Sequence, residues 1–358
     1  MNQEYKCPNC GAAVNFDIES QQVVCPYCDT EFDVKAFAEY DNTLNANQED
    51  NMNWESRAGK DWEAGETDGM VEYVCKSCGG TIVCDINTTA TSCPYCDNPV
   101  VMMSNLSGML KPDIIIPFKI TKEAAKKAYI KHLRGKPLLP DKFKDENHID
   151  EIKGLYVPFW LFDADVDASM QFRGTKIRHW SDMSYHYTEY SYYSVFRAAK
   201  MGFMNVPVDG STKMPDDLME SVEPFLLAEA DEFRTAYLAG YYADKYDVDA
   251  DDSMSRANDR IKASATAMIR GTVIGYSKLS VDSSSVNLHD SSSKYAMYPI
   301  WILATTWNDK KYLFAMNGQT GKFVGDLPVD KKKFWGFFTL FAIVFSALVF
   351  IAAYLILA

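Results

Sequence analysis

The chain carries one four-cysteine pattern twice, 68 residues apart: Cys7-Pro-Asn-Cys10 with Cys25-Pro-Tyr-Cys28, and Cys75-Lys-Ser-Cys78 with Cys93-Pro-Tyr-Cys96. In each copy, 14 residues separate the two CxxC pairs. Two residues between cysteines allow a tight turn that directs both sulfur atoms at one ion, and a second such turn completes a tetrahedral thiolate cage. The pattern predicts two structural Zn²⁺ ions, one held by Cys7, Cys10, Cys25 and Cys28, the other by Cys75, Cys78, Cys93 and Cys96.

The residues around the cysteines repeat as well. Gly11 and Gly79 follow the first pair of each copy, where a residue that tolerates positive φ lets backbone amides turn toward the sulfur atoms. Short alternating runs between the turns predict the strands of a small β-ribbon. We therefore interpret residues 1–39 and 71–105 as two zinc ribbons. Four protein thiolates leave no open coordination position, so both sites are expected to be structural rather than catalytic.

A ninth cysteine, Cys84, lies outside both patterns. When the two copies are aligned, Cys84 corresponds to Phe16, so its position is apolar in the first copy. We interpret it as a buried thiol rather than a ligand. The alternative for the other eight cysteines is a pair of disulfide-stapled modules, which are typical of oxidising compartments and small secreted domains.

The C-terminal end indicates where the protein is located. Residues 334–358 form a stretch of 25 residues without a charge or a proline. As a helix this stretch is about 37 Å long, against a hydrocarbon core of about 30 Å. The preceding Lys331-Lys332-Lys333 stays in the cytoplasm by the positive-inside rule, and the N-terminus has no apolar leader. The sequence predicts a single-pass cell-membrane protein with a cytoplasmic N-terminal body, where reducing conditions favour zinc over disulfides.

Charge is distributed unevenly along the chain. Residues 1–110 hold 5 of the 36 Lys and Arg but 18 of the 49 Asp and Glu, so they carry a net charge of −13, equal to that of the whole chain. Proteins that bind nucleic acid need Lys and Arg to neutralise phosphates. We therefore expect protein partners for the ribbons, with nucleic acid as the alternative. Residues 40–70, between the ribbons, are acidic and poor in aliphatic side chains, which predicts a flexible linker.

Two tryptophans interrupt this linker, Trp54 and Trp62. Isolated tryptophans in a polar segment are interpreted as weakly ordered, with docking onto a partner or onto the ribbons as the alternative. Residues 106–330 are long enough for one α+β domain, a mixed antiparallel sheet with helices. Its expected strands are 113–120, 155–172, 185–206, 272–288, 295–306, 311–316 and 322–325, and its expected helices are 121–134, 215–245 and 252–269.

The first of these helices carries a basic face of Lys122, Lys126, Lys127, Lys131 and Arg134. We interpret this face as solvated, with anionic lipid or the acidic ribbon end as alternative contacts. The body contains no P-loop and no GxSxG, HExxH or GxGxxG motif, so the sequence predicts neither an enzyme nor a small-molecule substrate.

Histidines and tyrosines gather near the middle of the chain. His179 and His186 are interpreted as packing residues, with proton transfer as the alternative. The aromatic run from Tyr185 to Tyr193 alternates as in a sheet, which indicates ordinary sheet packing, with a stacking platform for bases as the alternative.

Several separated motifs share one resemblance: Leu155-Tyr-Val-Pro-Phe-Trp-Leu-Phe-Asp163, Asn205-Val-Pro-Val-Asp-Gly-Ser211, Tyr237-Leu-Ala-Gly-Tyr241 and Phe314-Ala-Met-Asn-Gly-Gln-Thr-Gly-Lys322. With the twin ribbons and the terminal span, they resemble the transcription factor IIB-type zinc-ribbon membrane proteins of Gram-positive bacteria, the YdjG-like proteins. The resemblance covers nearly the whole chain. It implies a membrane complex with a phage-shock-type envelope-stress protein and an SPFH-domain partner. The label of primosomal helicase, also given to such proteins, has no P-loop here to support it.

From these observations we expect a non-enzymatic zinc-ribbon membrane adaptor or scaffold that recruits proteins to the cytoplasmic face of the membrane in envelope stress. The alternative is a membrane-tethered nucleic-acid-binding factor in replication or transcription. Binding of DNA or RNA that weakens steeply with salt distinguishes the second function from the first.

Overall fold

The computed structural model describes residues 5, 7, 12–35, 37–38, 50–54, 58–86, 88, 92–105 and 108–357. The chain divides into two units. The first comprises Met1–Arg57, Leu161–Pro207 and Met254–Ser293, and the second comprises Ala58–Trp160, Val208–Ser253 and Lys294–Ala358. The residues for which the sequence predicted one α+β domain are thus shared between both units. The long strands β8 (Lys153–Ser181) and β12 (Lys278–Trp307) each contribute residues to both.

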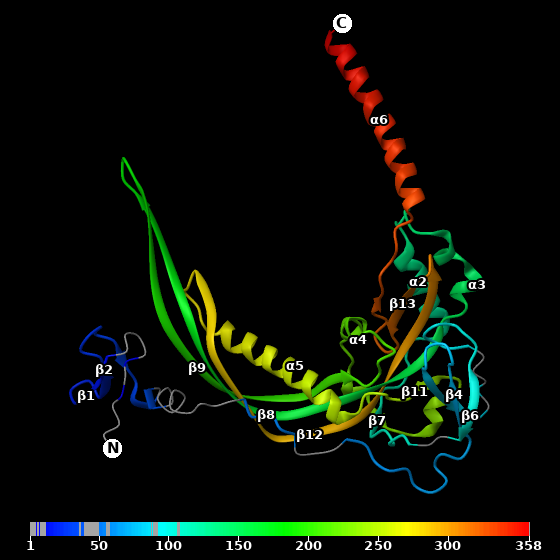
Figure 1. Cartoon of the computed structure of the whole chain (residues 1–358), viewed down its shortest axis with the longest axis horizontal. Coiled ribbons are helices and arrows are strands. Elements are labelled where there is room, and N and C mark those ends of the chain that lie inside the picture. The colour runs from blue at the N-terminus through cyan, green and yellow to red at the C-terminus, as the bar shows by residue number, and fades with distance from the viewer. Residues whose placement is uncertain are drawn as a thin grey trace. The chain divides into compact units, whose positions relative to one another are not determined.

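The first unit contains a sheet of long strands covered on one face by a helix (Figure 1). Strand β8 lies between β12 and β9 (His186–Asp209), and helix α5 (Ala250–Gly271) lies along the sheet. Alternate residues of β8, from Ala164 to Phe172, point toward the helix and are buried. They meet Ile261, Ala265 and Ile269, which recur every four residues on one face of α5. The predicted helix at 252–269 is therefore confirmed.

Residues 50–54, in the middle of the predicted linker, are fastened to the rest of the first unit. The Trp54 Nε1 atom donates to Asn258 Oδ1 over 2.9 Å, and its ring packs edge-on against Phe162. Asp50 pairs with Lys262 and accepts from the backbone amide of Val286. Contrary to the expectation of weak order, this tryptophan is docked. Residues 40–49 and 55–57 of the predicted linker lie outside the described residues.

Trp62 is docked in the same way, in the second unit. Its Nε1 atom donates to the carbonyl of Met109 over 2.8 Å, and its ring meets Phe233 edge-on. The interpretation of residues 58–70 as a flexible linker missed these contacts, because a single large side chain can hold a polar segment that local composition describes as linker-like.

The second unit is built on a sheet that incorporates the second cysteine pattern. Its strands lie in the order β10 (Asp231–Glu232), β7 (Ile114–Ile115), β12, β8, β11 (Tyr242–Asp244), β5 (Thr81–Asp85), β4 (Met70–Val74) and β6 (Val101–Asn105), with β13 (Lys310–Asn317) and β14 (Phe323–Val324) extending from β12. The short strand β11 runs parallel to β8 at Leu155 and Tyr156 and antiparallel to β5 at Ile82 and Val83. The second cysteine module is therefore continuous with a larger sheet rather than separate from it.

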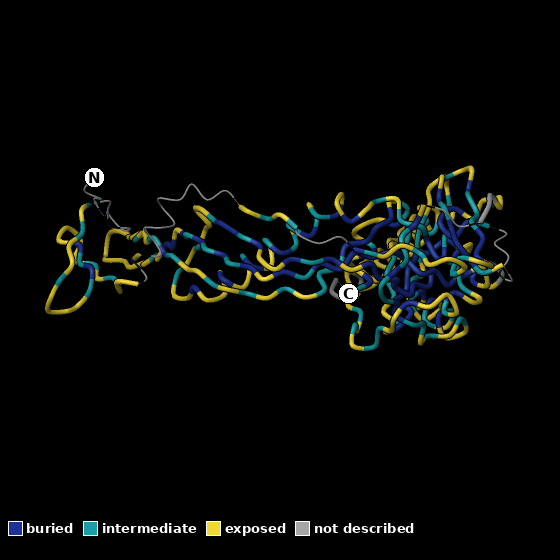
Figure 2. The backbone as a smooth tube through the Cα atoms, turned by 90° about the horizontal axis from the view of Figure 1, so that it is seen from below, coloured by how far each residue is buried: buried dark blue, intermediate teal, exposed yellow. Residues whose placement is uncertain are grey.

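Helices cover part of this sheet. Helix α2 (Lys122–Leu133) begins as predicted after Thr121, whose side chain accepts from the Ala124 amide. Its buried residues Ala125, Tyr129 and Leu133 recur every four positions and pack with the 3-10 helix η1 (Asp141–Lys144), α3 (Glu146–Ile149), β12 and β13. Figure 2 shows buried residues along the long strands of the first unit and gathered more densely in the second.

The long helix predicted at 215–245 is wrong. The chain forms only α4 (Asp216–Val222) there, followed by the 3-10 helices η2 (Leu227–Glu229) and η3 (Thr235–Leu238) with the short strands β10 and β11. Pro224 cannot donate a helical hydrogen bond, and Gly240 adopts a φ of +81°. These two residues explain why the helical pattern does not continue.

The remaining elements lie at the two ends of the chain. The first cysteine module forms a three-stranded antiparallel sheet of β1 (Asn15–Asp17), β2 (Gln22–Val24) and β3 (Glu31–Phe32). Helix α6 (Lys331–Leu357) follows the second unit, and the part from Lys331 to Ala353 is long and apolar enough to cross a membrane. None of that part is buried inside the protein, which fits a span surrounded by lipid.

Candidate metal centres

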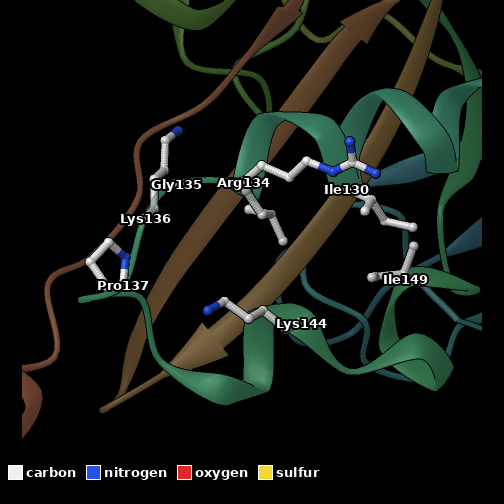
Figure 3. Close-up of a pocket in the computed structure, with 8 residues that line it drawn as sticks. Ile130, Arg134, Gly135, Lys136, Pro137, Lys144 and Ile149 are labelled. Atoms are coloured by element: carbon white, nitrogen blue, oxygen red, sulfur yellow. The ribbon is translucent and has the colours of Figure 1, made fainter.

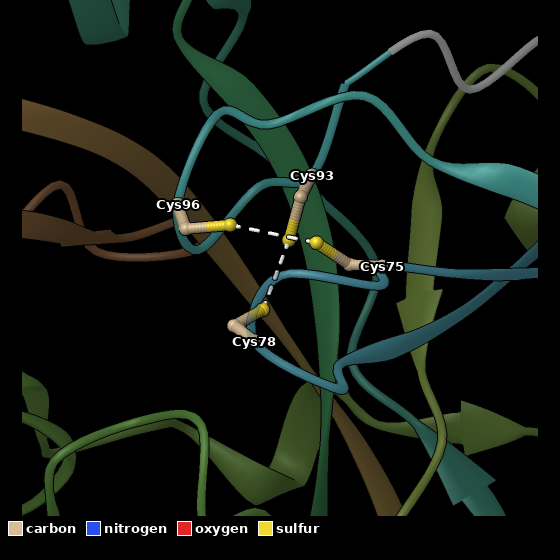
Figure 4. A group of neighbouring side chains, drawn as sticks. All are labelled: Cys75, Cys78, Cys93 and Cys96. Atoms are coloured by element: carbon tan, nitrogen blue, oxygen red, sulfur yellow. Dashed lines mark hydrogen bonds between the residues drawn. The ribbon is translucent and has the colours of Figure 1, made fainter.

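The second cysteine cluster comprises Cys75, Cys78, Cys93 and Cys96, and Figure 4 shows their sulfur atoms converging from two turns. The Sγ atoms of Cys75 and Cys96 are 3.5 Å apart, those of Cys78 and Cys93 are 3.6 Å apart, and all four lie within 4.8 Å of one another. A disulfide requires about 2.05 Å. A tetrahedral ion with metal–sulfur bonds of about 2.3 Å places the sulfur atoms about 3.8 Å apart. The cluster therefore has the dimensions of a tetrathiolate metal site.

Both turns of this cluster use the same backbone geometry. The amide of Cys75 donates to Gly80, and the amide of Gly79 donates back to the carbonyl of Cys75 over 2.8 Å. The second turn repeats this pattern, since the amide of Asp97 donates to the carbonyl of Cys93 over 2.9 Å. Gly79 has a φ of +71°, as expected, and Asp97 has a φ of +58°. Aspartate is among the few residues other than glycine that adopt this conformation readily, and sequence reasoning missed its role.

Gly80 has a steric role. A Cβ atom at this position would lie 2.9 Å from the ring of Tyr95, which is buried against the first turn. The Tyr95 ring of the second turn therefore packs against the backbone of the first turn at Gly80. This contact explains why a second glycine follows Gly79.

The electrostatic environment of the four thiols differs from one to another. Burial opposes ionisation of Cys96, but the backbone amide and side chain of Asn98 outweigh it and lower the pKa of the thiol to about 6. Burial raises the pKa of Cys78 and of Cys93. A bound dication favours the thiolate form of all four, so binding of a metal ion here would release protons from Cys78 and Cys93.

Lys153 places a positive charge beside the second turn. Its Nζ atom donates to Ser92 Oγ over 2.5 Å and to the carbonyl of Cys93 over 3.3 Å, and it forms an ion pair of 3.1 Å with Asp97. Lys153 is the first residue of β8, so it also fastens the cluster to the main sheet. It is remote from the cysteines in the chain, and sequence reasoning did not find it. A cation here offsets the negative charge of a tetrathiolate site.

The first cluster is described for three of its four predicted ligands. Cys7, Cys25 and Cys28 have sulfur atoms within 4.8 Å of one another, with Cys7 and Cys28 3.6 Å apart. The Thr30 hydroxyl lies 3.1 Å from Cys28 Sγ and lowers the pKa of this exposed thiol to about 7. Cys10 and Gly11 lie outside the described residues. The three described cysteines are therefore compatible with a second metal ion.

Cys84 belongs to neither cluster. It is completely buried in β5, and its Sγ atom donates to the carbonyl of Thr88 over 3.1 Å. Burial raises the pKa of this thiol to about 11. The interpretation as a buried thiol that binds no metal is consistent with each of these features.

The histidines and tyrosines singled out in the sequence lie at the end of the β8–β9 hairpin. We call residues 180–193 the hairpin tip. Its large exposed side chains are Trp180, Met183, Tyr185, Tyr187, Tyr190, Tyr192 and Tyr193. The rings of Trp180 and Tyr187 stack across the two strands with centroids 5.4 Å apart. Ordinary sheet packing was expected for these aromatics, but their side chains are exposed and contact mainly one another, apart from Tyr193, whose ring meets that of Tyr276.

His179 and His186 are exposed as well. His179 Nδ1 lies 2.9 Å from Thr188 Oγ1 on the neighbouring strand, and His186 begins β9. The turn between the strands is held by Asp182, whose Oδ1 atom accepts from the amides of Ser184 and Tyr185. Tyr187 donates to the other oxygen of this carboxylate. The tip is therefore a well-defined hairpin with an aromatic surface, rather than a site that encloses a substrate.

Comparison with known proteins gives one informative match. The chain is similar to the uncharacterized protein YdjG of Bacillus subtilis (strain 168), with 32% identity over 335 residues, which are 94% of this chain and 93% of that protein. No family model matches the sequence. No solved structure matches it either.

Proposed function

Since the chain belongs to the YdjG family, we propose that it is a non-enzymatic membrane adaptor. In this proposal α6 anchors the protein in the cell membrane with its N-terminal body in the cytoplasm. The two cysteine clusters bind Zn²⁺ as zinc ribbons of the transcription factor IIB type and act as rigid recognition modules. Their role is to bring protein partners to the cytoplasmic face of the membrane.

The observation that carries the proposal is the closed geometry of the second cluster. Four cysteine sulfur atoms surround one point, and three of the four residues are buried. Four thiolates fill the coordination sphere of zinc, which leaves no position for a water molecule or substrate. Such an ion stabilises a small module whose apolar core is insufficient on its own. In a chain that also carries a candidate membrane span, rigid modules of this kind suit recruitment better than catalysis.

Two surfaces of the protein suit contacts with partners. The first is the acidic N-terminal third, whose net charge of −13 disfavours the phosphate backbone of nucleic acid and favours a basic protein surface. The second is the hairpin tip, where tyrosines and a tryptophan are exposed together. These residue types dominate the energetics of protein interfaces.

The partners that the sequence resemblance implies are a phage-shock-type envelope-stress protein and an SPFH-domain protein. We propose these as the recruited proteins. The test is a detergent pull-down of the tagged full-length protein from its native membrane, read by mass spectrometry. Wild type is compared with Cys25→Ser/Cys28→Ser and with Tyr185→Ser/Tyr192→Ser. We expect the first variant to lose at least one partner because its ribbon loses two ligands.

The control is Cys84→Ala, which removes a cysteine outside both clusters and should retain every partner. A wild-type pull-down in a zinc chelator should reproduce the loss seen with Cys25→Ser/Cys28→Ser. Retention of all partners by both double variants would contradict the adaptor proposal. Recovery of replication proteins with DNA or RNA, released steeply by salt, would support the nucleic-acid-binding alternative instead.

A further inference from the structure

A cavity of about 450 Å³ lies beside the C-terminal end of α2 (Figure 3). Its volume is within the range of small-molecule sites, about 300 to 1,000 Å³. The lining residues fall into two groups, the apolar side chains of Ile130, Leu133 and Ile149 and the cations Arg134, Lys136 and Lys144. In Figure 3, Arg134 and Lys144 lie on opposite sides of Ile130 and Ile149. An apolar floor between cations is the complement of an anionic amphiphile.

The cations around this cavity are available to a ligand. Within the described part of the chain, the guanidinium of Arg134 has no carboxylate partner. Lys144 interacts electrostatically with the carboxylate of Asp141, but that carboxylate forms its ion pair with Lys333, at 2.5 Å. Lys136 contacts the His132 ring rather than an acid, with 3.1 Å between Nζ and Nε2. No Asp or Glu is among the residues described as lining the cavity. Its electrostatic potential therefore favours an anion.

The cavity wall is fastened to the start of α6. The backbone amide of Asp330 donates to the carbonyl of Leu138 over 2.8 Å. Lys333, in the first turn of α6, donates to the carbonyl of Leu139 over 2.9 Å as well as pairing with Asp141. These contacts fall between Pro137 and Lys144, which both line the cavity. The apolar residues of α6 begin at Phe334, so the cavity lies near the level at which the chain enters the bilayer.

A second cavity on the same side has the composition of a membrane interface. It measures about 540 Å³ and is lined in part by Trp307, Tyr312, Lys310, Lys331 and Lys332. Tryptophan, tyrosine and lysine are the residues enriched at headgroup level. Helix η1 lies near both cavities: its last residue, Lys144, lines the first, and Lys142 Nζ donates over 2.7 Å to the carbonyl of Thr306, next to Trp307 of the second. Side chains typical of the membrane interface therefore surround the start of α6 in the second cavity as well as in the first.

We propose that the cavity beside α2 binds one anionic phospholipid of the surrounding membrane, with the phosphate between Arg134 and Lys144 and the start of an acyl chain on Ile130, Leu133 and Ile149. The lipid connects α2 and η1 to the membrane surface beside α6. This site is independent of partner recruitment by the ribbons.

Native mass spectrometry of the full-length protein in detergent tests this site. The protein is titrated with dioleoylphosphatidylglycerol and, separately, with dioleoylphosphatidylcholine. We expect one phosphatidylglycerol to bind more tightly than phosphatidylcholine, and Arg134→Glu/Lys144→Glu to weaken it at least about tenfold. The matched control is Lys127→Glu/Lys131→Glu, which reverses two exposed charges on the same helix outside the cavity and should bind as wild type does.

A further variant examines the apolar floor without changing charge. Ile130 is 41% exposed, so Ile130→Ser should fold normally and still weaken phosphatidylglycerol binding. Metal content and tryptophan emission equal to wild type confirm the fold of each variant. Equal binding of both lipids would overturn the proposal. So would equal loss in the control variant, or displacement of the lipid by glycerol 3-phosphate at the same concentration, since that anion has no acyl chain.

Discussion

At the scale of single residues, the cysteines differ in what their loss should do. Cys75→Ser removes one of four ligands, so we expect the metal content of the purified protein to fall from two ions per chain toward one. Cys84→Ala removes a thiol that donates to the carbonyl of Thr88 and belongs to neither cluster, so the metal content should stay at two. Inductively coupled plasma mass spectrometry measures both. Metal loss in Cys84→Ala would instead make Cys84 a ligand.

Asp244 should make the stability of the second unit depend on pH. This carboxyl group is fully buried in β11, and burial raises its pKa from 3.8 to about 7. The folded protein therefore keeps the proton to a higher pH than the unfolded chain. The contribution of protonated Asp244 to the free energy of unfolding is therefore fully present below about pH 4 and is lost as the pH rises through about 7. Asp244→Asn cannot ionise and should not show this loss.

The measurement is urea unfolding followed by tryptophan fluorescence at pH 5 and pH 8. We expect the difference in unfolding free energy between Asp244→Asn and wild type to grow in favour of the variant by about 2 to 3 kcal/mol between these values. All other titrating groups are common to both proteins and cancel. A difference that does not change with pH would mean that Asp244 ionises normally in the folded state.

The grouping of seven of the eight candidate ligands was predictable from sequence, but their surroundings were not. Spacing alone identified the cysteines, because two intervening residues restrict the directions of both sulfur atoms. Asp97 was missed because aspartate tolerates positive φ but adopts it only where a turn requires it, so the residue type alone did not predict this role. Lys153 was missed because it approaches the second turn from another strand, and no local pattern predicts a contact between residues that are so distant in the chain.

At the scale of elements, the docking of Trp54 gives a direct test of the fold. Trp54→Ala removes the hydrogen bond to Asn258 and the ring contact with Phe162, and should destabilise the first unit by about 2 kcal/mol. The amide of Leu288 donates to the carbonyl of Asn51, so its hydrogen exchange should accelerate in the variant. Exchange mass spectrometry reports this directly. Trp62→Ala is the control, since its contacts lie in the second unit, and equal acceleration in that variant would argue against a local effect.

Periodicity predicted the long elements and failed for the short ones. The alternation in β8 and β9 and the four-residue spacing in α5 are repeated often enough to be recognised. The strands expected at 272–288 and 295–306 are one strand, β12, because the polar residues between them keep the extended conformation. Between Pro215 and Tyr242 every element is at most seven residues long, so no period could be recognised there.

At the scale of the whole molecule, the division into two units was not predictable. Strands β8 and β12 contain 29 and 30 residues, far above the usual length of about 3 to 10. In both strands the burial pattern changes near the boundary, from residues buried in succession in the second unit to alternation in the first. Both patterns are typical of strands, so neither by itself indicates a division of the chain. What separates the units is the partner of each segment, α5 in the first and the α2 layer in the second.

The candidate membrane span in α6 leads to the prediction with the widest consequence. A chain ending at Asp330 lacks α6 but keeps the residues of both units before it, so we expect it to move from the membrane fraction to the soluble fraction. Since Lys331–Lys333 precede the span, the body should face the cytoplasm. In right-side-out vesicles, added protease should then leave an N-terminal tag intact and remove a tag placed after Ala358. Digestion of the N-terminal tag under these conditions would place the cysteine clusters outside the cell, where reducing conditions are absent and thiolate metal sites are hard to maintain.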